Sequence, residues 1–295
     1  MEKYLDIFAK GFSDYWNYII YDISNPSWNS YFYLLIAVSI FFYALEILFP
    51  WRKGQKLIRK DFWLDFFYMF FNFFIFSLII YNSVSNVFVT LFNDFLALFG
   101  ITNIVAIKID QLAVWVQLGI LFIARDFIQW NVHRLLHAVP FLWQFHKVHH
   151  SVKEMGFAAH LRFHWMETIV YKFIQYVPLA MLGFGLVEFF IVDAFAIAVG
   201  HFNHSNFKIN LGPLKYLFNS PQMHIWHHAK ELPKDRRMGV NFGITLSIWD
   251  YIFKTVYIPY DGRDIELGFD DEHEFPQNFV NQELYPFIKN ERARK

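Results

Sequence analysis

The chain of 295 residues contains no cysteine. Disulfide bonds, thiolate zinc sites and cysteine nucleophiles are therefore excluded, as are iron–sulfur clusters bound by thiolates. A metal site in this protein would have to use histidine and carboxylate side chains instead.

Charged residues are also scarce, at 18% of the chain, and the 26 basic side chains balance the 26 acidic ones. A net charge of zero gives no reason to expect nucleic acid as a partner. Hydrophobic residues reach 56% and aromatic residues 22%, which is too apolar for an ordinary soluble domain. The composition predicts an all-α integral membrane protein with several transmembrane helices.

We expect no secretory signal in the first residues of the chain. Acidic residues begin at Glu2, and no apolar core near the start ends in a small-residue cleavage site. We interpret residues 1–30 as an interfacial N-terminal segment. Its aromatic side chains would equally suit a helix packed on the body of the protein.

Four apolar stretches predict the membrane-embedded part, at residues 31–49, 62–92, 112–130 and 168–199. The second is long for one crossing, which predicts a tilt or a break near residues 82–86. Each half of the fourth is short for a crossing, so we expect a tilted or re-entrant hairpin there. The positive-inside rule places the basic loop 50–61 in the cytoplasm, and the loop 93–110, with a single lysine, is expected outside.

Twelve of the thirteen histidines lie between His133 and His228. They form clusters in which the imidazoles share one helix face. The clusters are His133 and His137; His146, His149 and His150; and His224, His227 and His228. Scattered histidines would not repeat this spacing three times, so the pattern indicates metal binding. Eight imidazoles exceed the needs of one four-coordinate ion, and two ions are therefore expected.

Residues near the clusters could complete or orient them. His201 and His204 are one turn apart and could complete two coordination shells. Asp126 precedes His133 by two helical turns on the same face, so its carboxylate could orient a ligating imidazole through the other ring nitrogen. His160 and His273 are expected to be bystanders.

Five segments, in this order, resemble the fatty acid hydroxylase and sterol desaturase superfamily. They are HRLLH at 133–137, HKVHHS at 146–151, RFHWME at 162–167, HSNFKINLGPLKYLFNSPQMHIWHH at 204–228 and NFGITLSIWDYIFKT at 241–255. The resemblance extends over about residues 126–255. Within it, the LGPL, NSP and HIWHH run looks most similar to alkylglycerol monooxygenase and its bacterial relatives.

The resemblance implies an integral-membrane di-iron enzyme that activates O2 and hydroxylates a lipid C–H bond in a fatty acyl, alkylglycerol or sterol-like substrate. It implies that residues 31–255 form the membrane catalytic domain, with a cytoplasmic histidine-rich helical cap that holds the dimetal site. Residues 256–295 would be a cytoplasmic tail. Electrons would come from a separate ferredoxin, cytochrome b5 or reductase.

The resemblance also assigns roles to individual residues. The metal ligands would be the eight clustered histidines and His204, whereas His201 is less regular in the pattern. The family's R-x-H-x-x-E element is matched by Arg162, His164 and Glu167, which we interpret as orienting or packing the histidines. Trp249 and Asp250 match a WD pair near the cap, for which helix packing and capping are an equally good interpretation.

We also have expectations for the membrane in which the protein lies and for the surface on which its electron donor docks. We expect a multi-pass protein of a bacterial inner membrane with the site facing the cytoplasm, and an endoplasmic reticulum membrane is the alternative. Basic residues in 52–60 and 230–237 could dock an acidic electron donor. They could equally set the topology and contact lipid head groups.

Three alternative functions stay open. Desaturation begins with the same hydrogen abstraction, so the sequence does not separate it from hydroxylation. A membrane zinc hydrolase would use Glu167 or Asp126 as its base, although the HExxH motif is absent. Zinc in purified protein would not exclude iron, because imidazole sites accept both metals. A metal transporter would need its ligands inside the membrane spans.

We predict that His149→Ala and His228→Ala each abolish activity and lose bound metal, because each change removes a neutral imidazole from a cluster. His273→Ala lies outside the clusters and is the matched control, which should keep both metal and activity. Metal analysis and turnover of the three purified variants test this. Normal metal content and turnover in His149→Ala would contradict the assignment.

Overall fold

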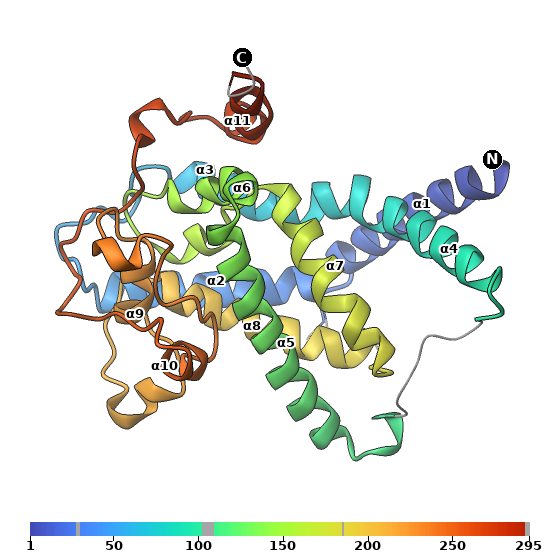
Figure 1. Cartoon of the computed structure of the whole chain (residues 1–295), viewed down its shortest axis with the longest axis horizontal. Coiled ribbons are helices and arrows are strands. Elements are labelled where there is room, and N and C mark those ends of the chain that lie inside the picture. Colours follow the sequence, from blue (N-terminus) through green and yellow to red (C-terminus); the bar gives the residue numbers. More distant parts are fainter. Residues whose placement is uncertain (28–29, 102–108, 185, 293–295) are drawn as a thin grey trace.

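The computed structural model describes residues 1–27, 30–101, 109–184 and 186–292 (Figure 1). This part of the chain folds into helices joined by loops, with isolated bridges but no β-strand, which confirms the all-α prediction. The α-helices are α1 (Glu2–Ser24), α2 (Tyr31–Leu48), α3 (Phe62–Phe70), α4 (Ser83–Ala97), α5 (Val114–Ala138), α6 (Pro140–His150), α7 (Trp165–Met181), α8 (Leu186–His204), α9 (Pro221–His227), α10 (Ile248–Ile252) and α11 (Phe279–Arg292).

Shorter or irregular helical segments connect these elements. A π-helix links α3 to α4 over Phe71–Asn82. The 3₁₀ turns are Ile109–Gln111, Phe157–Leu161, Gly212–Tyr216, Lys234–Arg236 and Glu272–Glu274. The loops that follow α8 contain only short helices before α11 begins.

The long helices α2, α5, α7 and α8 form a bundle. Helix α5 packs against α7 and α8, and α8 packs against α2. Helices α9 and α10 lie at one side of this bundle, whereas α1 and α4 pack together and extend toward the other side (Figure 1). Helix α11 packs on α6.

The stretch 168–199, for which we predicted a tilted or re-entrant hairpin, forms α7 and α8, and Gly183, where φ is +80°, lies between them. How these two helices lie in a membrane stays a prediction. Residue 185 lies outside the described residues. The long apolar stretch 62–92 changes its helix type, and the predicted break near 82–86 falls where the π-helix gives way to α4. Helix α4 continues to Ala97, so the loop begins later than expected, and residues 102–108 of it lie outside the described residues.

Within the described residues, α2 is the one helix that is both long and apolar enough to cross a bilayer, with a mean hydropathy of 2.0 over 18 residues. Its N-terminus is capped by the Ser30 hydroxyl, which accepts from the backbone N–H of Tyr33 at 3.3 Å. The multi-pass arrangement rests on the other apolar stretches and stays a prediction.

A sharp corner between α5 and α6 positions the first two histidine clusters. Val139 is extended (φ −95°, ψ 114°), as expected for a residue that precedes proline. Pro140 then begins α6, at a position where a missing N–H costs nothing. The corner allows the histidines of α6 to face those at the C-terminal end of α5.

Candidate metal centre

Nine histidine side chains converge into two groups, and within each group the potential ligand atoms lie within 4.8 Å of one another. The five-histidine group consists of His133, His137, His146, His150 and His227, and the four-histidine group consists of His149, His204, His224 and His228. The rings of His150 and His228 stack with centroids 4.5 Å apart, so the two groups are neighbours. The fold thus brings all three sequence clusters and His204 to one place.

Hydrogen bonds fix where the lone pairs of two members of the four-histidine group point. Nδ1 of His149 donates to the carbonyl of Arg162 at 3.1 Å. Nδ1 of His204 donates to the carbonyl of Gly200 at 2.8 Å. A neutral ring with its proton on Nδ1 has a lone pair on Nε2. The two Nε2 atoms face each other 3.3 Å apart with no proton to share, and a cation between them would remove the repulsion.

The five-histidine group repeats this arrangement. Nδ1 of His133 donates to the carbonyl of Phe242 at 2.7 Å. Nδ1 of His227 donates to the carbonyl of Val240 at 2.8 Å. The Nε2 atom of His227 is buried and has no hydrogen-bond partner among the described residues. Buried polar atoms are rarely left unsatisfied, so the orphaned nitrogen is a further sign that this group is built around a cation.

The distances between Nε2 atoms fit the edges of a coordination shell. Metal–nitrogen bonds of about 2.0–2.1 Å place neighbouring ligand nitrogens roughly 3.0–3.4 Å apart. The observed separations are 3.2 Å for His133 and His146, 3.1 Å for His137 and His150, 3.1 Å for His204 and His224, and 3.2 Å for His224 and His228. Each group therefore has the spacing required to hold one ion.

Burial keeps these imidazoles in the form that binds metal. It lowers the pKa of His149 to about 4 and the pKa of His228 well below its ordinary value of 6.5, because an imidazolium in the interior would lose its hydration. Neutral imidazole is the ligating form. The lone pairs are consequently available at neutral pH, and the donor set of both groups is nitrogen alone.

Glu167, in the first turn of α7, contacts one of the rings from outside. Its Oε2 lies 2.8 Å from Nδ1 of His146, and both side chains are buried. A carboxylate on the outer nitrogen of a ligating histidine fixes the ring orientation and the tautomer. The geometry therefore gives Glu167 an orienting contact with the five-histidine group.

Arg162 supports the histidine groups in two ways, through its backbone carbonyl and through a buried cluster of ion pairs. Its carbonyl orients His149, while its guanidinium donates to Asp65 at 3.1 Å and to the Ser151 hydroxyl at 2.8 Å. Asp65 also pairs with Arg59. Sequence reasoning missed Asp65, although an aspartate inside the apolar run of α3 was a signal, because a buried carboxylate needs a partner.

A loop between α9 and α10 supplies two of the orienting carbonyls, and Asp250 holds its shape. The Asp250 carboxylate accepts from the backbone N–H groups of Phe242 and Gly243, at 2.9 and 2.8 Å. It also accepts from the Trp130 indole at 3.1 Å. The loop is thereby tied to α5, the helix that carries His133. Asp250 thus acts on the metal centre through the backbone of the loop.

The sequence suggested that Asp126 could orient a ligating histidine, but in the structure its carboxylate has other partners. Its carboxylate accepts from the Trp249 indole at 2.8 Å and from the backbone N–H of Thr245 at 3.3 Å. The seven residues from Asp126 to His133 correspond to about 10 Å along α5, which is beyond the reach of the ring. Asp126 supports the same loop as Asp250.

His164 and His201 lie outside both groups. His164 accepts from the backbone N–H of Met166 at 3.0 Å, and its Nε2 donates to the carbonyl of Glu283 in α11 at 2.9 Å. Nε2 of His201 lies 3.2 Å from the hydroxyl of Ser39 in α2. Both nitrogens of His164 are thus engaged elsewhere, and the structure does not bring His201 into a coordination shell.

His160, expected to be a bystander, lies half-buried beside the four-histidine group. Its ring centroid lies 5.3 Å from that of His204, and its Nδ1 lies 3.0 Å from Nδ1 of His201. A side chain on Gly200 would collide with the His160 ring, so this glycine permits a close approach. In the sequence His160 precedes His164 by four residues, but the structure places His160 in the 3₁₀ turn Phe157–Leu161, so the two residues do not share a helix face and this spacing did not predict the neighbours of His160. His273, by contrast, is exposed.

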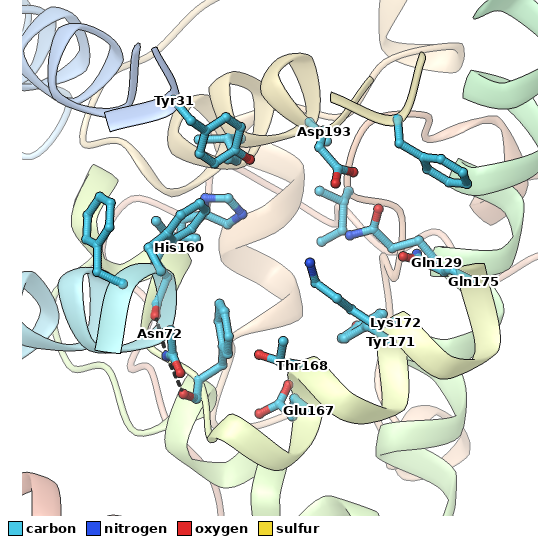
Figure 2. A pocket seen from close by; sticks show the side chains of 18 of the residues that line it. Tyr31, Asn72, Gln129, His160, Glu167, Thr168, Tyr171, Lys172, Gln175 and Asp193 are labelled. Carbon is cyan, nitrogen blue, oxygen red and sulfur yellow. Dashed lines mark hydrogen bonds between the residues drawn. The ribbon is translucent and has the colours of Figure 1, made fainter. Parts of the chain in front are cut away.

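A cavity of about 460 Å³ lies beside both groups, with His133, His146, His149 and His204 among its lining residues. Its volume is within the usual range for small-molecule sites. Figure 2 shows Glu167, Thr168 and Lys172 of α7 along one wall of this cavity, with Asn72 and His160 on another. The cavity gives a ligand access to the inner faces of the histidines.

Comparisons with known proteins agree with the site. The fatty acid hydroxylase family model matches residues 118–255, a stretch that contains every histidine of both groups. The resemblance to the fatty acid hydroxylase and sterol desaturase superfamily, predicted from the sequence, is thereby confirmed. No solved structure matches the chain significantly.

Several curated relatives act on lipids according to their names. Ornithine lipid hydroxylase OlsE of Rhizobium tropici is 30% identical over 183 residues, which cover 62% of this chain and 54% of that protein. Alkylglycerol monooxygenase of Homo sapiens is 31% identical over 134 residues, 45% of this chain and 29% of that protein. Methylsterol monooxygenase 1-1 of Arabidopsis thaliana is 25% identical over 142 residues, 47% of this chain and 46% of that protein. The chain thus spans about half the length of these relatives or less.

Replacing the carboxylate that joins the buried ion cluster tests its role. Asp65→Asn leaves Arg59 and Arg162 buried without their shared counter-ion, and we expect a loss of about 3 kcal/mol or more in the free energy of unfolding. Asp264→Asn removes an exposed carboxylate that pairs with Arg263 and should change little. Denaturant unfolding of both variants in detergent decides this, and equal stability of the two would contradict the role given to Asp65.

Proposed function

We propose that this protein is a membrane-bound monooxygenase that uses two irons, O2 and externally supplied electrons to hydroxylate a C–H bond of a lipid. The observation that carries the proposal is the pair of buried histidine groups, whose nitrogen lone pairs face one another without a proton between them. The family match and the lipid-directed names of the relatives support the reaction type.

Iron suits this donor set. Imidazole nitrogen is a good ligand for iron as well as for zinc, and the family match supports metal-dependent oxygenation. One ion would be held by the five-histidine group and the other by the four-histidine group. Bound iron would supply the oxidising power that a C–H bond requires and that no side chain has.

The chain's own residues position the lipid and keep the ligands aligned. The cavity includes Phe73, Phe74 and Phe163, apolar side chains that suit an alkyl chain and exclude water from it. Glu167 holds His146 in place, and the loop carbonyls of Val240 and Phe242 hold His227 and His133. These contacts fix the rings before any ligand arrives, which reduces the reorganisation needed during a reaction.

A multi-pass arrangement in the membrane is part of the proposal. Large apolar side chains are exposed on several helices, which marks an interaction with lipid. Examples are Phe41 on α2, Phe88 on α4, Trp115 on α5, Phe173 on α7 and Phe195 on α8. With the basic loop 50–61 on the cytoplasmic side, the histidine groups would face the cytoplasm of a bacterial cell.

A separate electron donor would dock on that side, and part of the basic segment is available for it. Lys53, Lys56 and Lys60 are exposed. We had expected the basic residues of 52–60 to include Arg52 and Arg59 as docking residues, and the structure corrects this. Arg52 donates to the Met155 carbonyl at 2.9 Å, and Arg59 is buried against Asp65. Docking of an acidic protein would therefore depend on these three lysines and on the exposed Lys234 and Arg237 of the second basic segment.

Isotope labelling tests the proposed function. Iron-loaded protein is given a chemical reductant, membrane lipid extract and ¹⁸O2, and we expect lipid-dependent O2 uptake and a lipid product that carries one labelled oxygen atom. Zinc-loaded protein is the matched control and should consume no O2, because zinc has no redox chemistry.

Two other outcomes of this experiment would favour a different reaction. A product that lacks two hydrogens and carries no label would establish desaturation in place of hydroxylation. Lipid hydrolysis by the zinc form, with no O2 uptake by the iron form, would contradict the monooxygenase and favour the hydrolase.

A further inference from the structure

Helix α11 has an exposed apolar face that neither the metal centre nor the cavity uses. Four large apolar side chains on it are between 42% and 59% exposed, those of Val280, Leu284, Phe287 and Ile288. They lie at positions i, i+4, i+7 and i+8, which is the pattern of one helix face. Large apolar side chains gathered on one exposed face mark an interaction with another apolar surface.

The opposite face of α11 is packed on the protein. The Phe279 ring meets that of Phe71, in the π-helix after α3, with centroids 4.6 Å apart. Gln282 is fully buried, and its side-chain carbonyl accepts from the Tyr68 hydroxyl at 3.0 Å. Pro286 is buried as well. Helix α11 is therefore held in one orientation, and its apolar face points away from the body of the protein.

A polar side of the helix separates these two faces. At about 100° per residue, Asn281 and Tyr285 lie between the apolar face and the buried one. Asn281 is exposed and Tyr285 is half-buried. Beyond the apolar residues the sequence is basic, with four basic residues and one acidic residue in 289–295. A helix with one apolar side, one polar side and basic residues near its end suits the boundary between lipid and water.

The direction of α11 agrees with such a location. Within the described residues, α2 is the one helix long and apolar enough to cross a bilayer. It runs across Figure 1, whereas α11 is strongly foreshortened there, so the two helix axes cross steeply. The 14 residues of α11 span about 21 Å, which is too short for a bilayer core of about 30 Å. Helix α11 can therefore lie along the membrane surface but cannot cross the membrane.

The exposed face continues onto the helices beside α11. Phe67 of α3 is exposed, and its ring contacts that of Phe279 with centroids 4.8 Å apart. Phe141 of α6 is exposed too, and Phe145 connects it to Phe287 through ring contacts of 5.1 and 5.7 Å. An apolar surface shared by three helices fits the continuous apolar phase of a bilayer.

We propose that α11 is an anchor at the membrane surface, with its apolar face inserted among the lipids of the leaflet next to the histidine groups. The inference rests on the membrane arrangement in the proposed function, and it differs from the cytoplasmic tail expected over 256–295. Helix α11 packs on α6, which carries three histidines of the metal centre, and the Glu283 carbonyl accepts from His164 at 2.9 Å. The anchor thereby fixes the metal centre at a defined height relative to the lipid substrate.

Single cysteines measure the depth of α11 directly, because the chain has none of its own. Leu284→Cys and Ile288→Cys are labelled with bimane in metal-loaded protein that is reconstituted into phosphatidylcholine bilayers. One quencher is iodide in the water, and the other is a nitroxide on the acyl chain of a minor lipid. With the apolar face about 5–10 Å into the bilayer, we expect the nitroxide lipid to quench both labels by about half or more.

Asn281→Cys is the matched control, since Asn281 is exposed on the same helix but lies outside the apolar face. Iodide should quench its label at least about fivefold more strongly than the label at position 284. Phe41→Cys on α2 reports on the proposed membrane arrangement, because Phe41 is exposed on the helix long enough to cross a bilayer. Its label should respond to the nitroxide lipid alone.

Two results would overturn the anchor: equal iodide quenching at positions 281 and 284, or labels at positions 284 and 288 that neither quencher reaches. The second result would mean that protein, such as a second copy of the chain, covers the face. If the nitroxide lipid quenches the label at position 41 in either case, the membrane arrangement stands and the anchor alone is wrong. Both α11 positions are exposed, so a cysteine at either costs little stability, and the measurement requires no turnover.

Discussion

The structure depends on one electrostatic constraint: nine imidazoles lie together, all of them buried except the half-buried His137. Four of them donate from Nδ1 to a backbone carbonyl, which leaves an Nε2 lone pair that points inward. Neutral rings that point lone pairs at each other repel, as the Nε2 atoms of His149 and His204 do at 3.3 Å. Cations among the rings would remove this repulsion. Each of the two groups could hold a metal ion, and a bound ion would then stabilise the fold around it.

Other parts of the chain orient the imidazole rings by accepting hydrogen bonds from their outer nitrogens. Backbone carbonyls do most of this, at Arg162, Gly200, Val240 and Phe242. Buried carboxylates in turn hold the backbone that presents them. Asp250 and Asp126 support the loop of Val240 and Phe242, and Asp65 fixes Arg162. A second layer of polar contacts thus lies under the bundle's apolar surface.

Helical spacing predicted the three histidine clusters, because side chains one turn apart share a face whatever the tertiary structure is. It could not predict how the histidines divide between two groups. His149 and His150 are neighbours in the chain yet belong to different groups, because consecutive side chains on a helix diverge by about 100°. The absence of His201 from both groups, and the contacts of Asp126 with Trp249, depend on packing between distant segments. Spacing along one helix carries no information about such contacts.

X-ray absorption at the iron edge, combined with a metal count on the iron-loaded protein, tests the central claim most directly. The account predicts two irons per chain, a first shell dominated by nitrogen at the distances of imidazole ligation, and the outer-shell scattering of histidine rings. One ion per chain, or a first shell dominated by oxygen without histidine scattering, would contradict it.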